Sequence, residues 1–307
     1  MHSDVLSVTL TYRGAPILVD PGTCSYRFRA EAGGSNVREY FAGPRAHNGF
    51  VIRDHDPLGP MTGDFRSHAA VPSLREVRRA TGTDLAFVEA AMGMLPHSRT
   101  ISRGVIHIRD IGFIVYNAVE PAFDSGDVAL SFQFAPECAV NHIADGELTV
   151  QRGDIALAFA YSHGLGGAKV VAGCESPLNG WVSPRYGERV AAPQLMFNMA
   201  GGCRLSSMAV LQQDGAKRIA IAGEQPTPSA RCFRIDSNDF CDYVLLNIGP
   251  LDAPVAAWGV SFQGRVAWLR IHRDGGCRLR WLDGRSCIAP RHGACYEYDE
   301  FLTDFSV

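Results

Sequence analysis

The stretch VLSVTLTYRGAPILV, residues 5–19, decides the fold class of this chain. Over residues 5–12, apolar side chains alternate with small or polar ones, which is the pattern of a half-buried β-strand. Arg13-Gly14 then marks a turn, and residues 16–19 form a second apolar run. The stretch therefore predicts two antiparallel strands joined by a tight turn.

The same β signature continues through most of the chain, and long amphipathic helices are missing. Gly-containing turn signals separate most of the expected strands, for example Asp274-Gly275-Gly276, Asp283-Gly284, Asp214-Gly215 and Ala144-Asp145-Gly146. The helix-like pieces are short, such as residues 73–81 with their arginine-rich face. We expect a single contiguous all-β domain over residues 1–307, built as a large antiparallel β-sandwich of stacked sheets. Further strands are expected at residues 50–52, 101–108, 111–119, 128–134, 147–151, 155–160, 194–199, 206–212, 218–222, 241–247, 260–271 and 277–282, with a last one around Tyr296.

Bulk composition excludes several classes of protein. The chain has 307 residues and a formal net charge of −3, so bulk electrostatics give no support for nucleic-acid binding. No apolar run approaches the roughly 20 residues that a membrane-spanning helix needs, and no secretory signal is visible. The nine cysteines form no C-x-x-C pair and are odd in number, which is not the pattern of a disulfide framework.

Three short phrases carry the strongest chemical signal, because they hold His2, Asp20 and His47. Two imidazoles and a carboxylate suit a divalent metal, with zinc first. There is a geometric obstacle, since a tight turn at Arg13-Gly14 pairs Asp20 with Ser7, and His2 would then lie roughly 16 Å further along the strand. The sequence therefore requires a bulge or bend near residues 3–4. On spacing alone, a hydrogen-bonded His-Asp cluster remains the alternative to a metal site.

The phrases together resemble a known family. HSDVLS (residues 2–7), GAPILVDPGT (14–23), REYF (38–41) and AHN (46–48) occur in the order and spacing of the C-terminal β domain of heparinase II/III-like polysaccharide lyases. GWVSPRYG (180–187) is similar to a later phrase of bacterial members. The resemblance is dense over residues 2–65, looser to about residue 212 and thin after that.

The resemblance implies an architecture and a reaction. In that family an N-terminal α/α toroid precedes stacked antiparallel sheets, and the active site lies between them. The resemblance makes His2, Asp20 and His47 the zinc ligands, with the metal holding loops in place more than taking part in chemistry. The family's catalytic histidine stands two places before the position of His2, and other catalytic residues come from the toroid. Since neither is in this sequence, we expect weak or no activity from the chain alone, and a self-associating face where the toroid would sit.

Such lyases cleave uronic-acid polysaccharides by β-elimination. A base takes the C5 proton, and donors or cations must neutralise the adjacent carboxylate. Arg45 and Asn48 are the candidate donors beside the metal phrase, and no catalytic residue is assigned. Trp181 and Tyr186 are candidates for a sugar-stacking surface, with ordinary core packing as the alternative. The expected partner is an acidic polysaccharide or oligosaccharide, and the resemblance implies a periplasmic or extracellular location.

Two other functions remain open from the sequence. The first is a non-catalytic carbohydrate-binding or polysaccharide-assembly module, which would retain glycans without forming product. The second is an iron(II) oxygenase, because His2-Ser3-Asp4 also matches the H-x-D of that class. Bound zinc would count against the oxygenase, and iron with 2-oxoglutarate turnover would favour it.

Overall fold

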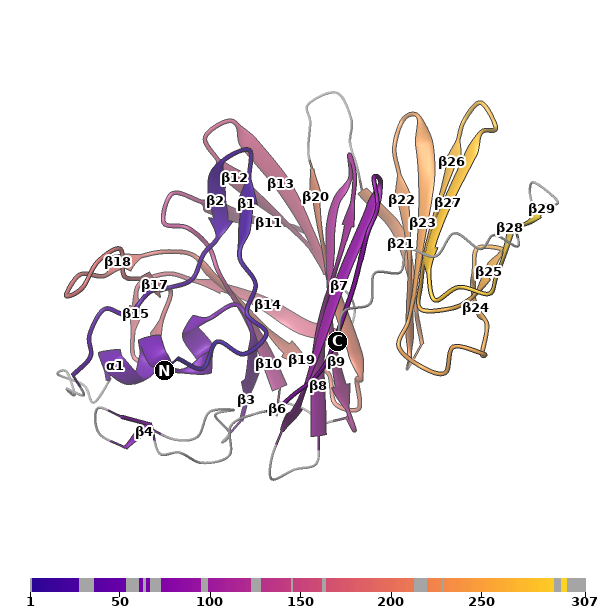
Figure 1. Cartoon of the computed structure of the whole chain (residues 1–307). Helices are drawn as coiled ribbons and strands as arrows, with labels where there is room; N and C mark the ends of the chain where they lie inside the picture. The colour runs from indigo at the N-terminus through magenta and orange to yellow at the C-terminus, as the bar shows by residue number, and fades with distance from the viewer. Residues whose placement is uncertain are drawn as a thin grey trace.

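The computed structural model describes residues 2–27, 36–53, 61–62, 65–66, 73–94, 99–122, 128–144, 146–161, 164–212, 220–227, 229–289 and 294–296. Antiparallel strands make up most of this part of the chain, and Figure 1 shows them arranged as successive sheets, from the N-terminal end to the yellow C-terminal strands. None of the helices among these residues has the length and apolarity to cross a membrane.

Four larger sheets form the body of the molecule. The β10 sheet has the order β14-β19-β10-β3, with strands Leu165–Val171, Gln194–Met199, Val128–Gln133 and Phe50–Ile52. The eight-stranded sheet has the order β11-β12-β13-β20-β9-β8-β7-β6, with strands Ala139–Ala144, Glu147–Arg152, Ile155–Tyr161, Leu205–Gln212, Gly112–Glu120, Arg99–Ile108, Leu85–Met94 and Ser73–Thr81.

The C-terminal third supplies the other two sheets. The five-stranded sheet has the order β21-β22-β23-β26-β27, with strands Ala220–Thr227, Ala230–Asp236, Phe240–Asn247, Val266–His272 and Cys277–Leu282. The β25 sheet has the order β24-β25-β28-β29, with strands Val255–Ala257, Val260–Gln263, Ser286–Ala289 and Ala294–Tyr296.

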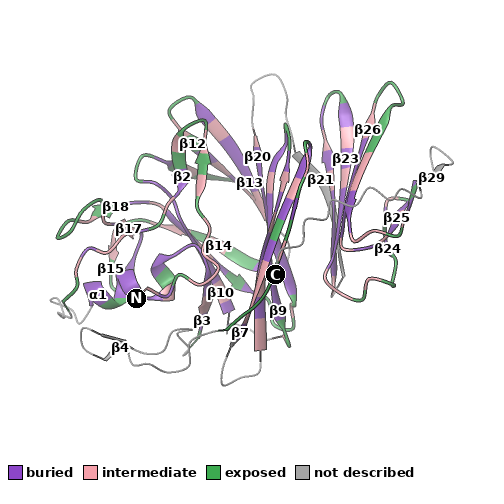
Figure 2. Ribbon diagram, viewed as in Figure 1, coloured by how far each residue is buried: buried purple, intermediate pink, exposed green. Residues whose placement is uncertain are grey.

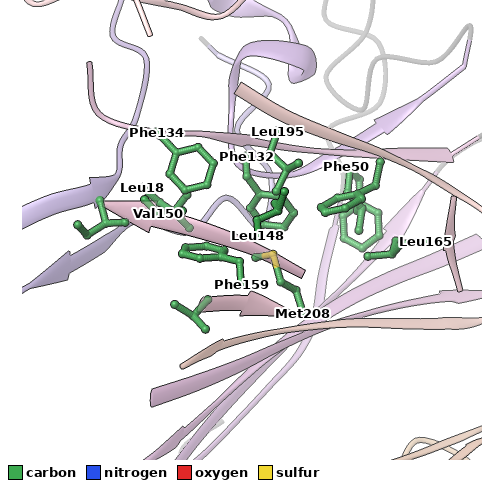
Figure 3. Packing of buried hydrophobic residues seen from close by; sticks show 14 of the residues in the cluster. Leu18, Phe50, Phe132, Phe134, Leu148, Val150, Phe159, Leu165, Leu195 and Met208 are labelled. Carbon is green, nitrogen blue, oxygen red and sulfur yellow. The ribbon is translucent and has the colours of Figure 1, made fainter. Parts of the chain in front are cut away.

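Buried side chains join each sheet to the next. Phe132 and Leu195 of the β10 sheet pack in one cluster with Phe159 and Met208 of the eight-stranded sheet (Figure 3). The opposite face of the eight-stranded sheet shares a second cluster with the five-stranded sheet, and a third cluster joins the latter to the β25 sheet. Figure 2 shows the purple, buried positions running through all these layers. The expectation of stacked antiparallel sheets is therefore confirmed.

Most expected strands are present with shifts of one or two residues at their ends. The range 260–271 is wrong as a single strand, because the chain turns at Gly264, where φ is +149°, and divides it into β25 and β26. A Cβ at Gly264 would lie 2.6 Å from the carbonyl oxygen of Asp283, so the turn requires glycine. The turn signals at Asp214-Gly215 and at Asp145 fall outside the described residues.

The expected helix at residues 73–81 is wrong. These residues form β6, which pairs antiparallel with β7 at the edge of the eight-stranded sheet. Leu74 and Val77 are exposed, and the arginine-rich face that suggested a helix belongs to an exposed strand. The arginines around Arg78 lie on β6, the edge strand of the sheet, where charged side chains oppose pairing with another chain.

The N-terminal hairpin is shorter than expected. Only β1 (Leu10–Tyr12) and β2 (Ala15–Leu18) pair, with an irregularity between Leu10 and Thr11. The chain bends before β1, where the N–H of Ser7 donates to the carbonyl of Asp4 at 2.9 Å and Leu6 has a φ of +56°. This turn is the departure from the strand that the spacing of His2 and Asp20 required.

Candidate functional site

The polar phrases of the N-terminal region converge at one end of the molecule. Figure 1 shows the N-terminus beside α1 (Val37–Ala42), near the small pairs formed by β15 (Cys174–Glu175), β16 (Leu178–Asn179), β17 (Trp181–Val182) and β18 (Val190–Ala191). The N–H of Ser3 donates to the carbonyl of Ala42 at 2.8 Å, which fixes His2 against the end of the helix. Asn36 caps the other end of α1 by accepting from the N–H of Glu39 at 3.1 Å.

His47 and Asp20 form a direct pair. Nδ1 of His47 lies 2.9 Å from Oδ2 of Asp20. His47 is buried, with 1% of its side chain exposed, whereas the Asp20 side chain is 49% exposed. Burial acts to raise the pKa of Asp20, but the hydrogen bonds from His47 and Gly22 lower it below its usual value, so the carboxylate is ionised and Nδ1–H donates to it. This leaves Nε2 of His47 buried without a hydrogen-bond partner among the described residues.

His2 completes the cluster. Its ring centroid lies 5.3 Å from that of His47, and its Nε2 lies 3.2 Å from Oγ1 of Thr23 and 3.3 Å from Nη1 of Arg38. Because a guanidinium can only donate, Nε2 of His2 must be the unprotonated acceptor. Burial, helped by the nearby His47 and Arg38, lowers the pKa of His2 to about 4 against the opposing effect of Asp20. His2 is therefore neutral at pH 7.

The turn that carries Asp20 rests on the later phrase of residues 180–187. Gly22 has a φ of +78°, and its N–H donates to Oδ1 of Asp20 at 3.0 Å. A Cβ at Gly22 would lie 2.5 Å from the carbonyl oxygen of Ser183, so only glycine fits. The N–H of Ser183 in turn donates to the carbonyl of Pro21 at 2.7 Å. The two phrases thus form one packed unit.

Asn48 and Arg45 flank His47 closely in the sequence and hydrogen-bond to neighbouring segments. Asn48 is fully buried; its amide donates to the carbonyl of Val19 at 2.9 Å and accepts from the N–H of Gln133 at 2.5 Å. The carbonyl of Arg45 accepts from Gln194 at 2.6 Å, while the Arg45 side chain is exposed. The expected role of these two residues as substrate donors is not tested by this geometry, but the Asn48 amide is already engaged by the backbone.

The two expected sugar-stacking residues differ in their surroundings. Trp181 donates from its indole N–H to the carbonyl of Cys174 at 2.9 Å, and the guanidinium of Arg189 lies 4.5 Å from its ring centroid. One side of the indole is therefore covered. Tyr186 is 61% exposed and stacks on Tyr26, which is 62% exposed, with ring centroids 5.5 Å apart and an interplanar angle of 22°.

The structure thus brings His2, Asp20 and His47 together, as the sequence predicted. Sequence reasoning assigned no role to Arg38, Thr23, Tyr26 or Arg103. Arg38 and Thr23 lie inside the phrases that carried the signal, so their proximity to the triad could have been considered. Arg103, on β8, donates to the backbone carbonyls of Leu6 and Asn48, and nothing in its local sequence indicates this.

The donor chemistry of the cluster partly fits a zinc ion. Zinc accepts imidazole nitrogen and carboxylate oxygen, and the buried, unpartnered Nε2 of His47 faces no competing donor in the described part of the chain. As arranged, however, Asp20 bonds to His47 directly, and the described residues contain no group of three His, Cys, Asp or Glu side chains that could hold a metal. The carboxylate would have to move for all three to share one ion.

A hollow of about 540 Å³ lies between the eight-stranded and five-stranded sheets. Its wall includes the buried Glu89, which pairs with Arg265 at 3.0 Å and accepts from the hydroxyl of Tyr116. None of the residues of the His2 cluster lines this hollow.

Comparison with known proteins gives a consistent result. The family described as "Heparinase II/III-like, C-terminal" matches residues 1–229. Two solved structures share the fold: a heparan sulfate lyase HepC mutant from Pedobacter heparinus, with a TM-score of 0.57 and 13% identity, and the heparinase III BT4657 gene product, with 0.53 and 13%. The matches cover 80% and 77% of this chain but only 37% and 35% of those chains. Comparison with curated protein sequences found no match.

Proposed function

The chain belongs to the heparinase II/III-like C-terminal family, and from that premise we propose that it is the β domain of a polysaccharide lyase acting on uronic-acid polymers by β-elimination. The solved neighbours are heparinases, and the chain spans little more than a third of their length. The single observation that supports the proposal beyond family membership is the convergence of His2, Asp20 and His47 beside the guanidinium of Arg38.

The cluster of His2, Asp20, His47 and Arg38 offers hydrogen-bond donors and acceptors. An elimination requires such groups next to the carboxylate of the substrate. Removal of the C5 proton becomes feasible when cationic or hydrogen-bonding groups stabilise the charge that develops on the adjacent carboxylate. Arg38 is such a group, and the neutral His2 beside it presents an acceptor. The residues of this chain would therefore orient and neutralise the uronate, while the proton-abstracting base is not assigned to any of them.

We also propose that His2, Asp20 and His47 bind zinc. The convergence of two imidazoles and a carboxylate supports this, together with the buried Nε2 of His47, which has no hydrogen-bond partner among the described residues. When bound, the ion would chiefly hold together the N-terminal segment, the turn after β2 and the segment after α1, three pieces of chain with little regular structure. Without the ion, the hydrogen bond between Asp20 and His47 holds the imidazole ring in place, and the carboxylate would have to shift to reach a shared ion.

Elimination is tested by following the ultraviolet absorbance of unsaturated uronate with heparan sulfate, alginate and hyaluronan. We expect little product from the chain alone, and product from a chimera in which it replaces the matched region of the Pedobacter heparan sulfate lyase. His47→Ala in the chimera should lower the rate at least tenfold. A chimera that binds substrate but forms no unsaturated product would refute the lyase function.

Zinc is tested by metal analysis of the purified chain and by competition with a chromophoric chelator. We expect one zinc per chain, and His2→Ala or His47→Ala should abolish its retention. Asp20→Asn should weaken affinity by about 10- to 100-fold if the carboxylate only orients His47, and by more if it is a direct ligand. Zinc binding that is identical in all three variants would refute the site.

The second candidate is a non-catalytic carbohydrate-binding module, favoured by the exposed aromatic ring of Tyr186. It predicts that the chain retains glycans and that neither the chain nor the chimera forms unsaturated product. The iron(II) oxygenase reading has no such support, because the exposed Asp4 makes no side-chain bond to the His2 cluster within the described residues. We further propose a periplasmic or extracellular location, which is where an acidic polysaccharide would be met.

A further inference from the structure

A line of side chains leads from the His2 cluster to the surface. Arg38 contacts His2 through Nη1, and its guanidinium carbon lies 5.7 Å from the ring centroid of Tyr26. Tyr26 in turn stacks on Tyr186. Tyr186 is far from Tyr26 and Arg38 in the sequence, so only the fold brings it into this row.

Arg38 has the character of an anion-binding group. It is 5% exposed, and its Nε is buried without a hydrogen-bond partner among the described residues. No ion pair joins it to a carboxylate among the residues that the structure describes. The neighbouring His2 is an acceptor and carries no negative charge, so no residue in the described part of the chain neutralises the guanidinium. A buried cation in this state favours an anionic partner from outside.

Tyr26 and Tyr186 have the character of a stacking surface. Two tyrosine rings that are each about three-fifths exposed leave a large apolar area in water, although the rings pack on one another. The loop that carries Tyr186 is fixed, because the N–H of Gly187 donates to the carbonyl of Cys24 at 2.8 Å. In the same loop Arg185 pairs with Glu188 at 2.7 Å. A ligand would therefore meet rings that are already positioned, which reduces the entropy lost on binding.

We propose that Arg38, Tyr26 and Tyr186 form a subsite for one uronate residue, with the guanidinium of Arg38 binding the carboxylate and the tyrosine pair packing on the pyranose ring. The carboxylate matches Arg38 in charge and in planar, two-oxygen geometry. The apolar face of a pyranose matches the exposed rings. This inference rests on the proposed function for its choice of sugar, and it assigns carboxylate recognition to Arg38 in place of Arg45 or Asn48.

The experiment measures binding of the full chain to two ligands by isothermal titration calorimetry. One is an unsulfated tetrasaccharide of alternating glucuronate and N-acetylglucosamine, whose only charges are carboxylates. The other is the same tetrasaccharide with its carboxylates reduced to hydroxymethyl groups. We expect the wild-type chain to bind the acidic ligand at least tenfold more tightly than the reduced ligand.

Two substitutions separate the two parts of the subsite. Arg38→Gln should remove the preference for the acidic ligand while leaving affinity for the reduced ligand within about twofold. Tyr186→Ala should weaken binding of both ligands by about tenfold, and Tyr186→Phe should restore it because the ring remains. Arg185→Gln is the matched control in the same loop; it removes a surface ion pair without touching the ring stack, and should bind as wild type.

Several results would overturn the subsite: no binding of the acidic ligand by wild type, an unchanged preference in Arg38→Gln, or wild-type affinity in Tyr186→Ala. A structural defect in Arg38→Gln would lower affinity for both ligands equally, and would therefore also count against the assignment. The outcome is separable from that of the elimination assay. Binding with the expected pattern but without unsaturated product would refute the lyase function and support the subsite. Product formation that is unaffected by Arg38→Gln and Tyr186→Ala would support the lyase function and refute the subsite.

Discussion

The imidazole of His2 is held neutral by its surroundings, and this gives the stability of the protein a defined dependence on pH. Burial is the largest cause of the lowered pKa of about 4, and the nearby His47 and Arg38 act in the same direction. Because the unfolded chain has a histidine pKa near 6.5, it binds more protons than the folded chain between these two values. The contribution of His2 is therefore complete above about pH 6.5 and is lost as the pH falls towards 4.

We expect NMR titration of the metal-free protein to show His2 neutral down to about pH 4. The loss of folding free energy between pH 6.5 and 4 should be smaller in His2→Asn than in wild type, since asparagine does not titrate. Exposed His142 provides the control, because His142→Asn should leave this pH dependence unchanged. A His2 that titrates near its ordinary value would contradict the burial and contacts described for it.

At the scale of the elements, Arg103 fastens the site to the eight-stranded sheet. Its guanidinium is buried between the rings of Phe50 and Phe132, at 5.3 and 5.6 Å from their centroids, and it donates from Nε to Asn117 at 2.8 Å. Nη1 donates to the carbonyls of Leu6 and Asn48, which flank the segments carrying His2 and His47. Burial lowers the pKa of Arg103 to about 9, so this cation is retained at a cost in solvation.

Arg103→Met should destabilise the protein by about 2–4 kcal/mol, because it leaves two buried carbonyls and the Asn117 side chain without their donor. Chemical denaturation measures the total loss. Hydrogen exchange should show added opening around residues 4–7 and 47–49, and zinc retention should fall if the proposed metal site exists. Arg109→Gln, which changes an exposed arginine in the turn after β8, is the matched control and should be nearly neutral. Equal stability of the two variants would show that Arg103 does not fasten the site.

At the scale of the whole molecule, the eight-stranded sheet carries a buried hydrophobic cluster on each face and couples the site-bearing half to the C-terminal half. Ile106 on β8 and Leu246 on β23 are fully buried in the same cluster, although they belong to different sheets. Such sharing favours unfolding as one unit, which is also what the expected single domain over residues 1–307 implies.

Ile106→Ala and Leu246→Ala should each lower the stability by about 2–5 kcal/mol and shift the same calorimetric transition. Val190→Ala, at an exposed position on β18, is the control and should change stability little. A second transition that moves only with Leu246→Ala would show that the C-terminal sheets unfold separately, and the single-domain prediction would then be wrong.

Local pattern in the sequence was sufficient to predict several features of the fold. Period-two alternation and glycine turns indicated an antiparallel β fold, because side-chain direction along a strand is set by neighbouring residues. The family resemblance implied that His2, Asp20 and His47 would meet, and the spacing around Arg13-Gly14 then required a bend near residues 3–4.

The contacts of each polar side chain, in contrast, follow from how distant parts of the chain pack together. Tyr26 and Tyr186 are separated by about half of the chain, and Arg103 meets the site from a strand of another layer. Residues 73–81 became an edge strand because β7 supplied their hydrogen-bond partners, although their own pattern favoured a helix. Pairing across sheets is set by long-range packing of the whole chain, and no window of sequence contains that information.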